Sequence, residues 1–236
     1  MAIWGIVPAA GLGKRMGASV PKQYLRINGK TVLQHSVERL GRVRALSGLV
    51  LVLHPDDETP MSADVPDILP VLIVRGGDER CHSVLNALDT LDSKSASDDW
   101  VLVHDAARPC LRPAEVDALV EAVGNHDVGG LLAAPVSDTL KRVNSRGEAV
   151  DTVDRSSLYR ALTPQIFRFS ILRRALQLAV EQGRVVTDDS AAVESLGFSP
   201  IVVPGSTDNI KITYESDLFL AELIMQHQIS SGPQSP

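Results

Sequence analysis

Short unbroken runs of apolar residues recur along this chain, and they limit its fold more than any other feature. Such runs cover residues 3–7, 49–53, 71–74, 101–103, 131–133 and 201–203. They lack the polar and apolar alternation of a strand with one face in water, which is typical of strands covered on both faces. The sequence therefore predicts a sheet with a helical layer on each side.

An amphipathic pattern with a start and a stop signal follows the first run. Thr31 is placed to cap a helix that carries Leu33, Val37 and Leu40 on one face and ends near Gly41. A helix is therefore expected between the first two strands.

Four further helices are expected along the chain. One begins at Pro113 and ends at Gly124, and Ser170 is expected to cap another. Two more are expected over residues 190–196 and 215–228. Because helices alternate with apolar runs, the sequence predicts an α/β fold, a Rossmann-like, mainly parallel sheet with helices on both faces. Ligands of such sheets bind at the carboxyl ends of the strands.

Residues at about 137–163 depart from this alternation of strands and helices. The stretch DTLKRVNSRGEAVDTVDRSSLYRALT alternates polar and apolar residues around the turn-like NSRG, which predicts a protruding antiparallel β-arm. An exposed arm needs a partner surface, and a second copy of the chain is the simplest partner. The alternative is an arm that folds back on its own subunit.

Charge and apolar content limit the classes of function. The 236 residues carry 23 Lys and Arg against 29 Asp and Glu, a formal charge of -6 that disfavours nucleic acid as a partner. The apolar runs fall far short of the roughly 20 residues of a membrane span, and no signal peptide is recognisable. Cys81 and Cys110 form neither a metal motif nor a disulfide framework. We expect a cytoplasmic protein that does not bind membranes, with one domain at 1–229 and a disordered tail at 230–236.

The first apolar run leads into PAAGLGKRMG and then PKQYL. Glycines there let the backbone approach a ligand closely, and Lys14, Arg15 and Lys22 indicate an anionic ligand. A dinucleotide fingerprint needs its third glycine one place before Gly17, and a P-loop needs glycine and lysine where Met16 and Gly17 stand. The loop suits a triphosphate and phosphoryl-type transfer instead. Taken alone, it could also be a helix start with solvated cations.

Three further stretches combine small and charged residues after an apolar run. They are VRGGDERCHSV, VLVHDAARPC and GSTDNIKIT. Because each follows the expected carboxyl end of a strand, all three should converge with the glycine loop on one crevice.

Together these stretches closely resemble the 2-C-methyl-D-erythritol 4-phosphate cytidylyltransferases, the CTP-using family of the non-mevalonate isoprenoid pathway. The resemblance covers nearly the whole chain, in the order PAAGLGKRMG, PKQYL, GGDER with Ser83, HDAARP, SDTLKR, VDR, ALTPQ, TDD and DNIK. Lys14, where arginine is frequent, and CHS after GGDER are slight departures. The resemblance implies one nucleotidyltransferase domain that joins the phosphate of methylerythritol phosphate to the α-phosphorus of CTP and expels pyrophosphate.

The resemblance also implies roles for cations around the reacting phosphates. Arg15 and Lys22 would be the catalytic pair that stabilises the charge developing on the α-phosphate. Arg155 and Lys211 would position the acceptor phosphate in line with CTP. Thr139, in the arm, would reach the same phosphate across a homodimer, so that each active site is shared.

Further residues match the family near the acceptor hydroxyls and the nucleotide. Asp105 and Arg108 would lie near the hydroxyls, with a plain strand-end ion pair as the alternative. The nucleotide would be surrounded by Ala9, Ala10, Gly11, Gly13, Gly77, Asp78, Ser83 and Ala106. Magnesium or another divalent cation is the implied cofactor, held mostly by CTP phosphates, with Asp105 as one protein candidate. His104 is expected to be a packed strand residue, because the chemistry removes no proton.

Two rival functions stay open on the sequence alone. A related cytidylyltransferase acting on another polyol phosphate, such as ribitol 5-phosphate, would keep the CTP site and change the acceptor pocket. A nucleotide-binding regulatory module, or a dehydrogenase with a degenerate fingerprint, would leave Lys22, Arg155 and Lys211 without a common explanation.

Overall fold

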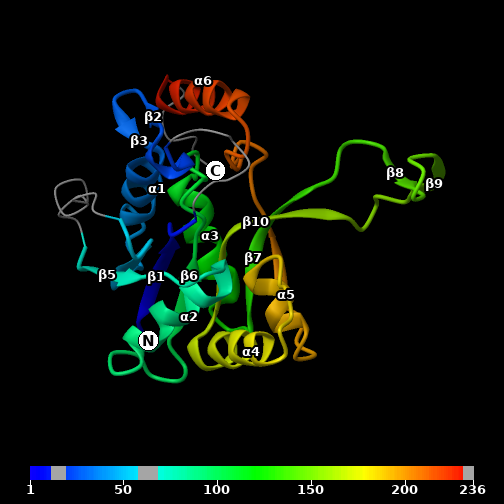
Figure 1. Cartoon of the computed structure of the whole chain (residues 1–236). Helices are drawn as coiled ribbons and strands as arrows, with labels where there is room; N and C mark the ends of the chain where they lie inside the picture. Colours follow the sequence, from blue (N-terminus) through cyan, green and yellow to red (C-terminus); the bar gives the residue numbers. More distant parts are fainter. Residues whose placement is uncertain (12–19, 58–68, 231–236) are drawn as a thin grey trace.

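The computed structural model describes residues 1–11, 20–57 and 69–230, and Figure 1 shows the course of the chain. A seven-stranded sheet forms its centre, in the order β11-β7-β10-β6-β1-β4-β5. Its strands are β1 (Ile3–Pro8), β4 (Gly48–Leu53), β5 (Val71–Arg75), β6 (Trp100–Val103), β7 (Gly129–Pro135), β10 (Tyr159–Arg168) and β11 (Ile201–Pro204). Neighbours pair in parallel except β10, which is antiparallel to both β6 and β7.

Helices cover both faces of the sheet because its strands are apolar on both sides. The helices are α1 (Val32–Gly41), α2 (Arg80–Leu91), α3 (Pro113–Val123), α4 (Phe169–Glu181), α5 (Asp189–Glu194) and α6 (Ser216–Ser230). Leu51 of β4 belongs to the apolar cluster that includes α1 and α3, whereas its neighbour Val50 belongs to the cluster of α2, α4 and α5. The predicted mainly parallel sheet with helices on both faces is confirmed.

The start of α1 follows the prediction, and the start of α4 does not. Thr31 Oγ1 accepts a hydrogen bond from Gln34 N at 3.1 Å, while the Gln34 side chain accepts one from Thr31 N, which together form a capping box. Ser170, the predicted cap of α4, is wrong. The helix already begins at Phe169, whose buried ring joins the second apolar cluster, and Ser170 is exposed within the first turn.

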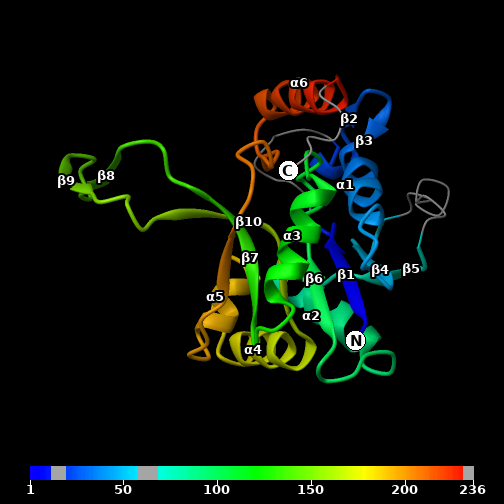
Figure 2. The same ribbon diagram turned by 180° about the vertical axis from the view of Figure 1, so that it is seen from behind.

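The projecting arm is present but ends earlier than predicted. Strands β8 (Leu140–Val143) and β9 (Ala149–Val153) pair antiparallel, and Figures 1 and 2 show them well away from the sheet. Residues 159–163, assigned to the arm from the sequence, are the first half of β10, which returns to the sheet between β6 and β7. The pattern hid this strand because residues 162–167 are all buried and do not alternate.

The carboxy-terminal helix covers a small hairpin rather than the sheet. Helix α6 shares a third apolar cluster with Ile27 and Ile212. Ile27 belongs to β2 (Arg26–Ile27), which pairs with β3 (Lys30–Thr31) and follows the short 3-10 helix η2 (Lys22–Tyr24). Ser230, expected in the tail, is the last residue of α6, and residues 231–236 lie outside the described residues. None of the helices in the described ranges has the length and apolar content that a membrane span requires.

Candidate active site

A cavity of about 620 Å³ opens beyond the carboxyl ends of β1, β4, β5 and β6. Strand β1 lies between β4 and β6, so the next strands of the chain lie on one side of β1 and the later strands on the other. Doubly wound sheets bind ligands at such a change of direction. The lining consists of residues 8–11, 22–23, 54–55, 76–80, 83, 105–107, 211 and 213. The stretches expected to converge on one crevice therefore do so.

Close packing of two loops shapes one side of this cavity. A Cβ atom on Gly76 would lie 2.3 Å from Ala10 Cβ, so only glycine lets the loop after β5 approach the loop after β1. Ser83 is buried and its hydroxyl accepts a hydrogen bond from Gly77 N at 3.2 Å. The predicted nucleotide residues that line the cavity are Ala9, Ala10, Gly11, Gly77, Asp78, Ser83 and Ala106. Gly13 lies outside the described residues.

Gln23 and His54 are among the lining residues that were not assigned a role from the sequence. Gln23 is buried and its side-chain amide donates to Ala9 O at 2.8 Å and to Gly11 O at 3.0 Å, which fixes the loop after β1. Its signal was its place in PKQYL, beside Lys22. His54 follows β4 and lines the same cavity, and no sequence motif had singled it out.

Two lysines from distant segments meet at the cavity. Lys22 Nζ donates to Ile212 O at 3.0 Å, one residue after Lys211, and both lysines line the cavity. Arg15, the other predicted catalytic cation, lies outside the described residues. The described part of the site therefore brings together one residue from each predicted pair of phosphate-binding cations.

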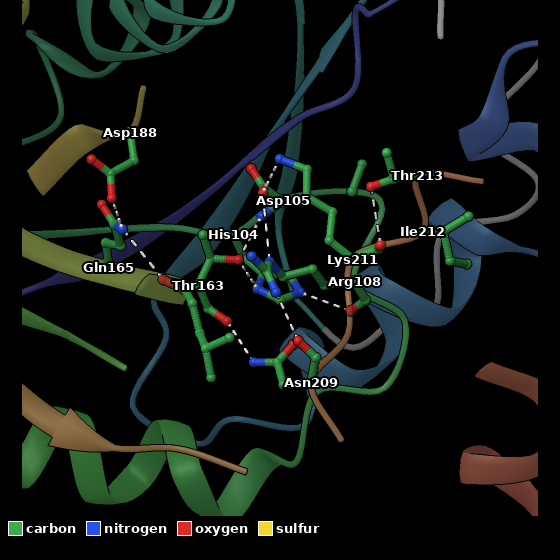
Figure 3. A network of polar contacts seen from close by, with 12 residues as sticks. His104, Asp105, Arg108, Thr163, Gln165, Asp188, Asn209, Lys211, Ile212 and Thr213 are labelled. Atoms are coloured by element: carbon green, nitrogen blue, oxygen red, sulfur yellow. Dashed lines mark hydrogen bonds and ion pairs between the residues drawn. The ribbon is translucent and has the colours of Figure 1, made fainter. Parts of the chain in front are cut away.

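Asp105 lies at the centre of an ion-pair network beside Lys211. Its carboxylate contacts Lys211 Nζ at 2.8 Å, Arg80 Nε at 3.1 Å and Arg108 Nε at 3.6 Å. Figure 3 shows Asp105, Arg108 and Lys211 gathered at this point. Burial alone would raise the pKa of Asp105, but the charges of Arg80, Lys211 and Arg108 outweigh it and hold that pKa well below its usual range. Asp105 is therefore an anion that organises cations and not a proton donor.

A second cavity of about 220 Å³ shares three residues with the first. Arg80, Asp105 and Lys211 line both, so the two cavities meet at the ion-pair network. The remainder of the second lining consists of residues 108, 161–163, 165 and 187–188. Two adjoining ligands could therefore share one group of charged side chains.

A buried polar network supports the lining of the second cavity. Thr163 Oγ1 accepts from Asp105 N at 3.1 Å and lies 3.0 Å from His104 Nδ1, and Asn209 Nδ2 donates to Thr163 O at 2.7 Å (Figure 3). Arg108 Nη1 donates to Asn209 O at 2.7 Å. Burial lowers the pKa of His104 to about 4, so its ring is neutral at pH 7. His104 is fully packed, as expected, but it lies one residue beyond the end of β6.

The two predicted site residues of the arm lie elsewhere in the single chain. Thr139 and Arg155 are exposed, and neither lines one of the two cavities. The Arg155 guanidinium donates to Ser137 O, at the base of the arm. One chain by itself therefore does not bring them to Lys211.

Known proteins resemble this chain over almost its full length. The family model described as 2-C-methyl-D-erythritol 4-phosphate cytidylyltransferase matches residues 3–227. A protein of that name from Hahella chejuensis is 48% identical over 225 residues, which cover 95% of this chain and 93% of the relative. Another from Vibrio vulnificus is 45% identical over 223 residues, covering 94% of each.

Solved structures agree with the sequence comparison. A crystal structure of 4-diphosphocytidyl-2C-methyl-D-erythritol synthase superimposes with a TM-score of 0.80 at 35% identity, covering 95% of this chain and 98% of the other. The 2-C-methyl-D-erythritol 4-phosphate cytidylyltransferase of Francisella tularensis gives a TM-score of 0.78 at 32% identity, covering 95% and 100%. Fold and sequence therefore point to the same proteins.

Proposed function

This chain belongs to the 2-C-methyl-D-erythritol 4-phosphate cytidylyltransferase family, and on that premise we propose that its two joined cavities bind the two substrates side by side. The chain is a nucleotidyltransferase that transfers a cytidylyl group from CTP to 2-C-methyl-D-erythritol 4-phosphate, in isoprenoid precursor biosynthesis. The larger cavity takes CTP and the smaller one takes the acceptor. The observation that carries this assignment is that two cations, Arg80 and Lys211, line both cavities.

The reaction exchanges one phosphorus–oxygen bond for another. An oxygen of the acceptor phosphate attacks the α-phosphorus of CTP, the bond from that phosphorus to the bridging oxygen of the β-phosphate breaks, and pyrophosphate leaves. The acceptor phosphate carries about 1.5 to 2 negative charges at pH 7, so it is a nucleophile without a general base. Repulsion between the two anions is therefore the main obstacle that the protein must overcome.

Lys22 and Lys211 divide this task by their positions. Lys22 lines only the larger cavity, where it and Arg15 stabilise charge on the α-phosphate and on the leaving pyrophosphate. Lys211 lines both cavities, where it binds the acceptor phosphate next to CTP. Asp105 and Arg108, at the wall of the smaller cavity, contact the acceptor hydroxyls.

A homodimer completes the site. The exposed arm carries Thr139 and Arg155 away from its own cavities, as expected if both residues reach the acceptor phosphate of a second copy. The arm also exposes Val143 and Val150, at 57% and 58%, which contact with a partner would cover. Each active site is then built from two chains.

Magnesium fits this site as an ion brought in with CTP. Of the described residues, no group of three or more His, Cys, Asp or Glu could hold a metal ion, and Asp105 is already engaged by three cations. Triphosphate oxygens are hard ligands that suit magnesium, and Asp78 and Glu79 are the lining carboxylates besides Asp105. When bound, the ion would neutralise part of the triphosphate charge.

A cytoplasmic location is supported by the two free, buried cysteines.

Pyrophosphate release with a panel of substrates tests the function. We expect release only when CTP and 2-C-methyl-D-erythritol 4-phosphate are both present, and little with ATP, GTP or UTP. Ribitol 5-phosphate and erythritol 4-phosphate serve as acceptor controls, since both keep the phosphate and change the carbon skeleton. Faster release with ribitol 5-phosphate would assign the chain to a different acceptor, and no release with any acceptor would refute catalysis.

A further inference from the structure

Arg80, the first residue of α2, lies where the two cavities meet, and no role for it follows from the steps above. Its guanidinium makes a two-pronged contact with Asp189, from Nη1 to Oδ1 at 3.0 Å and from Nη2 to Oδ2 at 2.7 Å. Its Nε donates to Asp105 Oδ1 at 3.1 Å. One side chain thus joins the start of α5 to the central carboxylate of the site.

Asp189 holds Arg80 in a fixed orientation. The Asp189 side chain is fully buried, so its charge must be neutralised by a protein partner and not by water. The neighbouring Asp188 fixes the start of α5, because its carboxylate accepts from Ala191 N at 2.9 Å and from Gln165 Nε2 at 2.7 Å. Because the guanidinium is planar and both of its terminal nitrogens bind Asp189, its Nε–H bond is directed toward Asp105.

Two further cations compete for the Asp105 carboxylate. Lys211 Nζ lies 2.8 Å from Asp105 Oδ2, whereas Arg108 Nε lies 3.6 Å from the same oxygen and is a buried donor that has no hydrogen-bond partner among the described residues. If Arg80 no longer bound Oδ1, the Asp105 carboxylate could rotate and accept a hydrogen bond from Arg108 Nε, because a buried unpaired donor is costly. Lys211 would then lose its present position.

We propose that Arg80, held by Asp189, is a positioning residue that keeps Asp105 turned toward Lys211 at the junction of the two cavities. Arg80 thereby sets where the acceptor phosphate is held relative to CTP. This inference rests on the proposed function, in which Lys211 binds that phosphate. The competing explanation is that Arg80 only ties α2 to α5.

The chain offers a matched control for that competing explanation. Arg173 of α4 also bridges two carboxylates, Asp89 at 3.0 Å and Asp92 at 2.5 Å, and so ties α4 to α2. The side chains of Arg80 and Arg173 are equally exposed, at 29%. Arg173 lines neither cavity. If each arginine only ties two helices together, the kinetic constants of the folded enzyme should stay unchanged at both positions.

Steady-state kinetics of Arg80→Lys and Arg173→Lys test the proposal. An ammonium keeps the charge but cannot bridge two carboxylates as a guanidinium does, so we expect the acceptor KM of Arg80→Lys to rise about tenfold while the CTP KM changes less than about twofold. Arg173→Lys should leave both constants within about twofold of the parent enzyme. Equal kinetic effects in the two variants would overturn the proposal.

A double-mutant cycle identifies the residue through which Arg80 acts. If Arg80 works through Lys211, then Arg80→Lys should change the acceptor kcat/KM less than about twofold once Lys211→Ala is present. Additive losses would overturn the proposal. Should Arg80→Lys fail to fold, Arg80→Met with Asp189→Leu replaces it, since that exchange leaves no buried charge unpaired, and the same criteria apply. Absence of pyrophosphate release by the parent enzyme would instead refute the proposed function.

Discussion

Lys22 contacts the residue that follows Lys211, yet the two lysines differ in which cavities they line. Lys22 contacts Ile212 O from η2, and Lys211 alone of the two also lines the smaller cavity. Proximity therefore does not make the two lysines equivalent. Their difference is one of geometry, since both carry the same charge.

This difference predicts distinct kinetic defects. Lys22→Ala should lower kcat about 100-fold with little change in CTP affinity, because it removes charge stabilisation needed chiefly in the transition state. Lys211→Ala should instead raise the acceptor KM about tenfold or more. Steady-state kinetics with each substrate varied in turn, together with CTP binding by calorimetry, measure both. Equal losses for both substrates in both variants would contradict this division.

His104 predicts a particular loss of stability in acid. Its pKa falls from 6.5 to about 4 in the folded chain because burial disfavours the charged ring. The unfolded chain therefore binds this proton more tightly than the folded chain does, so stability falls by up to about 3 kcal/mol as the pH drops from 6.5 toward 4. Urea denaturation between pH 7 and pH 4 should show a shallower decline for His104→Gln than for the parent chain. Parallel declines would argue against a buried neutral ring.

At the scale of elements, the arm is the part to which the proposal gives a role in a second chain. Strands β8 and β9 stand apart from the sheet, and the exposed Thr139 and Arg155 line neither of the two cavities described above. The proposed shared sites would explain why charged and hydroxyl side chains are placed on such an extension.

Mixed dimers should recover activity that neither variant has alone. When Arg155→Ala and Lys211→Ala chains are unfolded and refolded together, half of the dimers are mixed, and each mixed dimer has one site with both residues intact. Pyrophosphate release should therefore reach about one quarter of the parent value. Each variant refolded alone is the control. No gain on mixing would mean that Arg155 serves the site of its own chain or none.

At the scale of the whole molecule, the net charge is -6, and cations gather where the two cavities meet. Within the ion-pair network at that junction, Arg80, Arg108 and Lys211 outnumber the carboxylates of Asp105 and Asp189 by one. Anion binding is therefore a property of this junction and not of the overall surface.

Removal of divalent cations should stop turnover without weakening the fold. EDTA is expected to abolish pyrophosphate release, because the triphosphate loses its counter-ion. The melting temperature of the protein without CTP should change by less than about 1 °C, because a metal that arrives with CTP cannot stabilise the free chain. Thermal melts with EDTA and with excess magnesium measure this. A fall of several degrees would reveal a metal held by the protein itself.

What the sequence alone determined was local. The strand cores followed from apolar runs, because a strand buried on both faces cannot carry polar side chains on either face. The start of α1 followed from Thr31, because an N-cap side chain bonds within the first turn of its own helix. The resemblance added the family and the candidate cations, including Arg155 in the arm.

Only the tertiary structure decided which of these residues work together. Arg80 and Asp189 are 109 positions apart, and Lys211 meets Asp105 only after β6 and the loop beyond β11 are brought side by side. The spacing of polar and apolar residues did not predict strand β10, because its place in the sheet depends on pairing with β6 and β7. The spacing of polar and apolar residues indicates which side chains of one helix or strand are buried. It does not record pairing between elements, which long-range packing and charge neutralisation select in the folded chain.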